Sequence, residues 1–129
     1  MMRRRRVLSA VVLLISVIPV VLGGPLTPEN FGVGAGSYQS WSFEVSRSAR
    51  VFGQFRTQGG EINVLVIDEQ DFEAFRNGKG GHSYYDSGRV GGGQVELRLR
   101  SGRYVVIFDN RFSPYSSKTI SSNLQLAED

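Results

Sequence analysis

Residues 94–109, QVELRLRSGRYVVIFD, contain the clearest strand pattern in the chain and decide its fold class. The first seven residues alternate between polar and apolar side chains, as in a β-strand with one buried face. The apolar members are Val95, Leu97 and Leu99. The Ser101-Gly102 pair predicts a two-residue hairpin turn, after which residues 103–109 return as a run that is apolar on both faces. This stretch predicts two antiparallel strands, with at least one face of their sheet buried in the protein core.

Other short apolar segments recur along the chain between glycine, asparagine and serine residues. The further predicted strands are residues 37–45, 50–56, 61–67, 82–86 and 117–127. Residues 61–67 are apolar on both faces, which places them near the middle of a sheet. Asp68 is the expected N-cap of one short helix that ends at Asn77-Gly78. The pattern predicts an all-β, antiparallel two-sheet β-sandwich, jelly-roll-like, with one short helix.

The amino terminus has the layout of a secretion signal. Four arginines, residues 3–6, precede the uncharged and largely apolar residues 7–22, and Gly23 and Gly24 follow. We expect residues 1–24 to be a signal peptide or an N-terminal hydrophobic anchor helix, residues 25–36 a linker, and residues 37–129 the β-sandwich domain. The domain is then extracytoplasmic, either periplasmic or secreted, or anchored to the membrane through residues 7–23.

Composition excludes several classes of function. The 129 residues allow one domain, and the absence of cysteine excludes disulfides and thiolate chemistry. The chain has one histidine, so a site that needs two imidazoles cannot form within it. Outside the four leader arginines, 11 of the 15 basic residues remain against 12 acidic ones. The body of the protein is nearly neutral, and nucleic-acid binding is not expected.

Two local motifs suggest chemistry, and each has a simpler interpretation. His82 lies close in sequence to Tyr84, Tyr85 and Asp86, but no Gly-x-Ser-x-Gly nucleophile motif accompanies it. Residues 68–73 hold four carboxylates, which calcium favours, although acids in the first turn of a helix are expected in any case. We therefore predict no catalytic residues, no metal site and no cofactor.

The strand series from Ser37 to Leu126 resembles the GOLD (Golgi-dynamics) family of β-sandwich domains, in the form found in bacterial exported proteins. The resemblance rests on the following segments: Trp41-Ser42-Phe43, Val51-Phe52-Gly53-Gln54-Phe55, Ile62–Asp68, Tyr85-Asp86-Ser87-Gly88, the Val95-x-Leu97-x-Leu99 strand through Tyr104, Phe108-Asp109-Asn110-Arg111-Phe112-Ser113, and Lys118-Thr119-Ile120. It implies a β-sandwich that binds a protein or lipid surface without chemistry. GOLD-containing vesicle adaptors carry a lumenal disulfide that a cysteine-free chain cannot form, so the resemblance implies the fold and not a trafficking role.

The candidate binding residues are aromatic side chains in predicted loops and arginines of the predicted hairpin. They are Tyr84, Tyr85, Phe112 and Tyr115, together with Arg98, Arg100 and Arg111. Exposed loop aromatics can anchor a partner or stack on sugars, and arginines can form a basic patch, although arginines on a strand more often form a solvated face. Asn110, Ser113 and Lys118 are expected to have architectural roles.

These observations favour a non-enzymatic exported module that binds another protein or an envelope component. The alternative is a carbohydrate- or polyanion-binding module that uses the loop aromatics and the hairpin arginines. The sequence leaves open the identity of the ligand, the cleavage of the leader, the export route, the oligomeric state and calcium binding near Asp68–Glu73.

Overall fold

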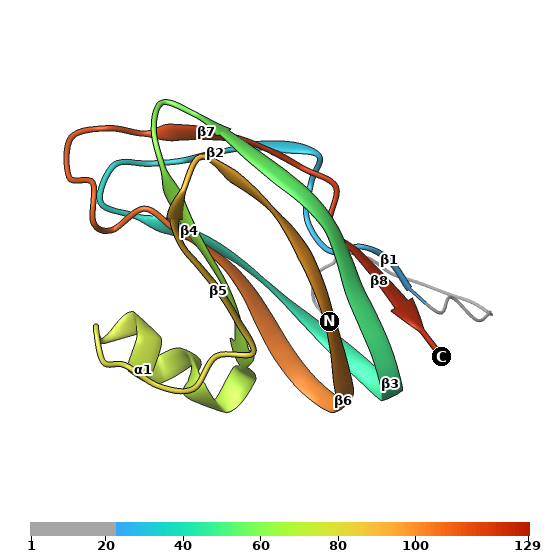
Figure 1. Cartoon of the computed structure of the whole chain (residues 1–129). Helices are drawn as coiled ribbons and strands as arrows, with labels where there is room; N and C mark the ends of the chain where they lie inside the picture. The colour runs from blue at the N-terminus through green and yellow to red at the C-terminus, as the bar shows by residue number, and fades with distance from the viewer. Residues whose placement is uncertain (1–22) are drawn as a thin grey trace.

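The structure is a computed structural model that describes residues 23–129, and it is built almost entirely from antiparallel strands (Figure 1). The elements in chain order are β1 (Gly23–Pro25), β2 (Asn30–Val33), β3 (Tyr38–Gln58), β4 (Ile62–Asp68), the 3-10 turn η1 (Glu69–Asp71), the helix α1 (Phe72–Arg76), β5 (Tyr85–Val90), β6 (Gly92–Asp109), β7 (Lys118–Ser122) and β8 (Gln125–Glu128). The predicted leader, except for Gly23 and Gly24, lies outside the described residues. Among residues 23–129, no helix has the length and apolar character needed to cross a membrane.

Two long strands, β3 and β6, form the centre of the fold. They pair with each other from Tyr38↔Asp109 to Arg56↔Gly92, with a register shift between Val45 and Ser48. Both strands bend sharply at the lower right of Figure 1, where they pass from one layer to the other. The strand order is β1-β8-β3-β6-β4-β5, and β7 pairs with both β3 and β2. One continuous sheet therefore folds over itself into two packed layers, the β-sandwich that the sequence predicts.

The predicted hairpin at Ser101-Gly102 is wrong. Residues 92–109 form the single strand β6, in which Gly102 pairs with Val45 at the bend. Both halves of β6 hydrogen-bond to β3 and not to each other, because β3 is equally long and bends at the matching position. Ser101 and Gly102 therefore lie where β6 bends from one layer to the other, and β3 is the pairing partner on both sides of the bend.

The predicted linker, residues 25–36, is part of the folded domain. Its strand β2 pairs with β7 from Asn30↔Ser121 to Val33↔Lys118. Val33 is fully buried, and Phe31 packs edge-on against Trp41 and Phe108. The strand was not predicted because it has only four residues and lies in a segment rich in glycine and proline. It is buried only because β7 pairs with it. The first described residue, Gly23, already pairs with Ala127.

The predicted short helix is confirmed, and it covers one face of the sheet. Asp68 is the N-cap residue of η1 by position but makes no side-chain capping hydrogen bond. The helix ends as predicted, where the Gly78 N–H donates to the Phe75 carbonyl oxygen at positive φ. Phe75 and Phe72 pack with Ile67, Val105 and Ile107 on the outer face of β4 and β6. This cover explains why both strands are apolar on both faces.

The main core lies between the two layers. Val95 and Leu99 are 2% and 3% exposed, and Leu97 packs against the core, as the alternating pattern predicts. The opposing layer contributes Val64, Val66, Val106 and Phe108. At roughly 25 cal/mol per Å² of apolar surface, this burial is the main stabilising contribution to the sandwich.

Candidate functional site

The loop between β6 and β7, residues 110–117, presents the most exposed aromatic side chain of the described residues. Tyr115 is 95% exposed, whereas Phe112 in the same loop is partly buried. The loop lies at the left end of the molecule in Figure 1, away from β1 and β8 at the right. This separation places the loop far from the point where the chain enters the domain at Gly23.

A dense set of hydrogen bonds fixes this loop. The side-chain amide nitrogen of buried Asn110 donates to the carbonyl oxygens of Gly34 at 3.0 Å and Ser116 at 2.8 Å. The Ser113 N–H donates to the Asn110 carbonyl oxygen at 3.1 Å, and the Gly36 N–H donates to the Ser113 carbonyl oxygen at 2.9 Å. The architectural role predicted for Asn110 is confirmed, because its side chain ties both ends of the loop to the β2–β3 connection.

Lys118 lies under this loop and is 3% exposed, which is more deeply buried than a side chain resting on the sandwich edge. Its Nζ donates to the Asn110 side-chain oxygen and lies 5.1 Å from the centre of the Phe112 ring. The β3–β4 turn covers its stem: a Cβ on Gly60 would come within 3.0 Å of the lysine Cε. The lysine thus joins two loops and β7.

A second cation, Arg89, lies over the Phe112 ring, and no pattern in the sequence indicated it. The guanidinium carbon of Arg89, on β5, lies 4.3 Å from the centre of the Phe112 ring. An arginine stacked on an aromatic face keeps its plane fixed while its edge N–H groups stay available to a ligand. Arg89 and Phe112 are far apart in sequence, and only the fold of β5 beside the loop reveals the pair.

The hairpin arginines do not form one basic patch. Arg98 pairs with Asp129 at 2.9 Å, and Arg111 pairs with Asp109 at 3.0 Å. Arg111 also donates to the Phe75 carbonyl oxygen at 2.8 Å and lies 3.8 Å from the Phe75 ring centre, so it anchors α1. Within residues 23–129, Arg100 alone of these three makes no ion pair. Carboxylates thus neutralise most of the predicted patch.

Tyr84 and Tyr85 lie on the β5 side of the sheet and not with the loop aromatics. Tyr84 is 41% exposed, donates its hydroxyl to Asp68 at 3.0 Å and packs edge-on against Tyr104. The hydrogen bond to Asp68 raises the pKa of Tyr84, and desolvation adds to this effect. Tyr85 is partly buried and donates to the Gln94 carbonyl oxygen at 3.2 Å, and this burial raises the pKa of its phenol.

His82 lies at a cavity of about 160 Å³ beside α1. Its apolar lining residues are Leu65, Ile67 and Phe75, and the rest of the lining is Asp71, Lys79, Gly80, Gly81, His82, Ser83 and Asp86. The His82 ring packs edge-on against Tyr84 with 4.8 Å between the ring centres. Within the described residues, no three His, Cys, Asp or Glu side chains come together in a group that could hold a metal ion, and this includes Asp68–Glu73.

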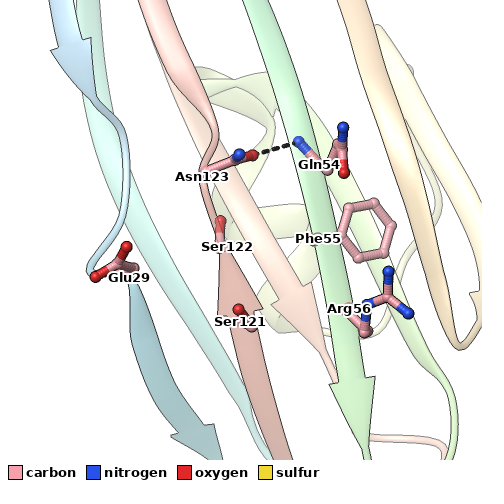
Figure 2. Close-up of a pocket in the computed structure, with 7 residues that line it drawn as sticks. All are labelled: Glu29, Gln54, Phe55, Arg56, Ser121, Ser122 and Asn123. Carbon is pink, nitrogen blue, oxygen red and sulfur yellow. Dashed lines mark hydrogen bonds between the residues drawn. The ribbon is translucent and has the colours of Figure 1, made fainter.

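A second hollow, of about 190 Å³, lies where β3 passes from pairing with β8 to pairing with β7 (Figure 2). Its lining is mostly polar and consists of Glu29, Gln54, Phe55, Arg56, Ser121, Ser122 and Asn123. The Gln54 N–H donates to the Asn123 side-chain oxygen at 2.7 Å, the bond drawn in Figure 2. A Cβ on Gly53 would lie 2.4 Å from the Asn123 carbonyl oxygen, so this junction requires glycine.

The fold therefore defines an all-β antiparallel protein of the β-sandwich type. No family model matches the chain, and no curated protein matches it. A similar solved structure is the pre-peptidase C-terminal domain of a collagenase from Bacillus anthracis, at 10% identity and a TM-score of 0.47, covering 72% of this chain and 86% of that chain. A likeness this distant carries no argument about family or function. The β-sandwich implied by the GOLD resemblance is present, and membership of that family stays a prediction.

Proposed function

We propose that this protein is a non-enzymatic exported binding module that recognises a protein or envelope component through its β6–β7 loop. The observation that carries the proposal is Tyr115, which is 95% exposed on a loop fixed by Asn110 and Lys118. An aromatic side chain offers a large contact area with few rotatable bonds. A fixed loop loses little additional conformational entropy on binding, so more of the contact energy appears as affinity.

The position of the loop agrees with this role. The described chain starts at Gly23, beside β8, and the β6–β7 loop lies at the other end of the sandwich (Figure 1). The predicted leader, residues 1–24, overlaps this start at Gly23 and Gly24, which belong to β1. If the leader anchors the protein, the β6–β7 loop lies at the end of the sandwich away from the anchor, and Tyr115 stays accessible to a partner.

The test is capture of partners by chemical cross-linking, using protein purified from cells that express the full chain. We expect envelope proteins captured by the wild-type chain to be lost with Tyr115→Ala. The matched control is Tyr84→Ala, which removes another exposed tyrosine, just before β5. Equal capture by Tyr115→Ala and the wild type would refute the role of the loop, and equal loss with both variants would show that the effect is not specific to it.

The hollow in Figure 2 supports the second candidate, carbohydrate binding. Amide, hydroxyl, carboxylate and guanidinium groups line it, and within the described residues the side chains of Glu29, Gln54 and Arg56 make no hydrogen bond or ion pair. Such groups can exchange hydrogen bonds with a hydroxyl-rich ligand. A glycan array tests this: binding lost with Gln54→Ala and kept with Tyr115→Ala would favour the sugar, and no binding would refute it.

A further inference from the structure

The Phe112 ring carries two positive charges at the loop end of the sandwich. The Arg89 guanidinium carbon lies 4.3 Å from the ring centre and the Lys118 Nζ lies 5.1 Å from it. Lys118 is buried and cannot reach an external partner, whereas Arg89 is exposed. The buried charge adds to the positive potential that a ligand meets at Arg89, because a partly buried charge is less screened by solvent and salt.

No carboxylate lies within ion-pair distance of either cation in the described part of the chain. The ion pairs there involve Arg50, Arg76, Arg98, Arg103 and Arg111. Arg89 is therefore held in place by an aromatic ring and not by a counter-ion. A guanidinium in this state retains donors for a bidentate bond to a carboxylate.

The charge at the other end of the same layer has the opposite sign. The carboxylates around η1, α1 and the start of β5 belong to Asp68, Glu69, Asp71, Glu73 and Asp86. Arg76 and Arg103 offset Glu73 and Glu69, and Lys79 lines the same cavity as Asp71 and Asp86. Carboxylates remain in excess at the helix end, which would disfavour an acidic partner there, since complementary fields steer association.

Arg89 and Tyr115 lie within reach of one short peptide. Arg89 stacks on Phe112, which is three residues from Tyr115 in the chain. The Cα atoms of Phe112 and Tyr115 are therefore at most about 11 Å apart. We propose that the site binds an acidic segment of a partner protein, with Arg89 pairing to a carboxylate and Tyr115 packing on the adjacent side chain. This inference rests on the proposed function and names the chemistry of the partner.

The test is a titration of the isotope-labelled protein, expressed from the full chain, with a hexaglutamate peptide, followed by amide chemical shifts. We expect shifts centred on residues 89, 112 and 115, weakening as salt is raised. Arg89→Gln should weaken binding about fivefold, the effect of losing one exposed ion pair of about 1 kcal/mol. The matched control is Arg100→Gln, which removes an exposed arginine without an ion pair in the described chain, near the bend in the middle of β6, and should leave binding unchanged.

Three outcomes would overturn the inference. One is equal response to hexaglutamine and hexaglutamate. Another is an equal effect of Arg89→Gln and Arg100→Gln. The third is Arg89-dependent binding to vesicles containing phosphatidylglycerol with no response to the peptide, which would assign the site to a membrane surface. If Tyr115→Ala still abolishes partner capture while hexaglutamate gives no response, the acidic chemistry is refuted and the proposed function stands.

Discussion

Lys118 and Asn110, eight residues apart in the chain, form a buried hydrogen bond in which the lysine ammonium donates to the asparagine side-chain oxygen. The amide nitrogen of the same Asn110 binds Gly34 and Ser116. One polar pair therefore connects β7, the β6–β7 loop and the β2–β3 connection. This connection gives Tyr115 a fixed base.

Replacing Lys118 with methionine should destabilise the protein. The change leaves the buried Asn110 oxygen without its donor, at a cost of about 1–3 kcal/mol. Urea denaturation measures the loss. The matched control is Lys79→Met, at an exposed position, which should change the free energy of unfolding by less than about 0.5 kcal/mol. An equal effect of both substitutions would show that the buried bond does not stabilise the fold.

Gly53→Ala should be strongly destabilising. The new Cβ would lie 2.4 Å from the Asn123 carbonyl oxygen, at a φ of +138° that non-glycine residues rarely adopt. We expect a loss of at least about 1–3 kcal/mol, measured by thermal and urea unfolding. Gly91→Ala is the control, because a Cβ there meets no atom within 4 Å. If Gly53→Ala proved as stable as Gly91→Ala, the close packing beside the polar hollow would be incorrect.

The stability of the protein should fall with acid partly through Asp129. The Ser48 hydroxyl and the Arg98 guanidinium hydrogen-bond to this carboxylate and lower its pKa below the ordinary 3.8. Because the folded-state pKa is lowered, the carboxylate contributes stability above the unfolded value of 3.8 and loses it as the pH falls through the folded value. Asp129→Asn should therefore flatten the acid side of the stability profile. An unchanged acid slope in this variant would contradict the assignment.

Phe75→Ala should detach α1 from the sheet. The Phe75 ring packs edge-on against Tyr38 at 5.2 Å between ring centres and carries the Arg111 guanidinium carbon at 3.8 Å. Removing a buried phenylalanine costs about 3–5 kcal/mol. Hydrogen exchange should show faster exchange in residues 69–82 than in β3 and β6. Phe72→Ala, at the less buried helix position, should have the smaller effect; the reverse order would contradict this packing.

The sequence correctly predicted the strands whose burial follows from local patterns. Val95 and Leu99 face the core because strand side chains alternate, and that alternation is a property of adjacent residues. The short helix after Asp68 was predictable for the same reason, since the cap position, two phenylalanines and the Asn77-Gly78 end lie within one segment. The two-sided apolar character of residues 61–67 predicted a strand near the middle of a sheet, and β4 pairs with β5 on one side and β6 on the other.

The errors share one physical cause. The Ser101-Gly102 pair indicates that the chain can change direction there. It does not indicate which strand the residues before and after it pair with, and both segments pair with β3. The short β2 has too few residues for a pattern and becomes a strand only through β7. Similarly, Arg98 near the predicted hairpin indicated positive charge, whereas its carboxylate partner, Asp129, comes from a distant part of the chain.

By itself, the sequence determined the class of fold and the location of its main core strands, because both depend on the order of neighbouring residues. The export signal at residues 1–24 stays a prediction. Tertiary structure alone decided which cations stay without carboxylates and which aromatic ring faces solvent. Arg89 meets Phe112, and Tyr115 is left outside, through strand pairing across large sequence separations. Local composition cannot encode such contacts, since they exist only once β5 and the β6–β7 loop lie side by side.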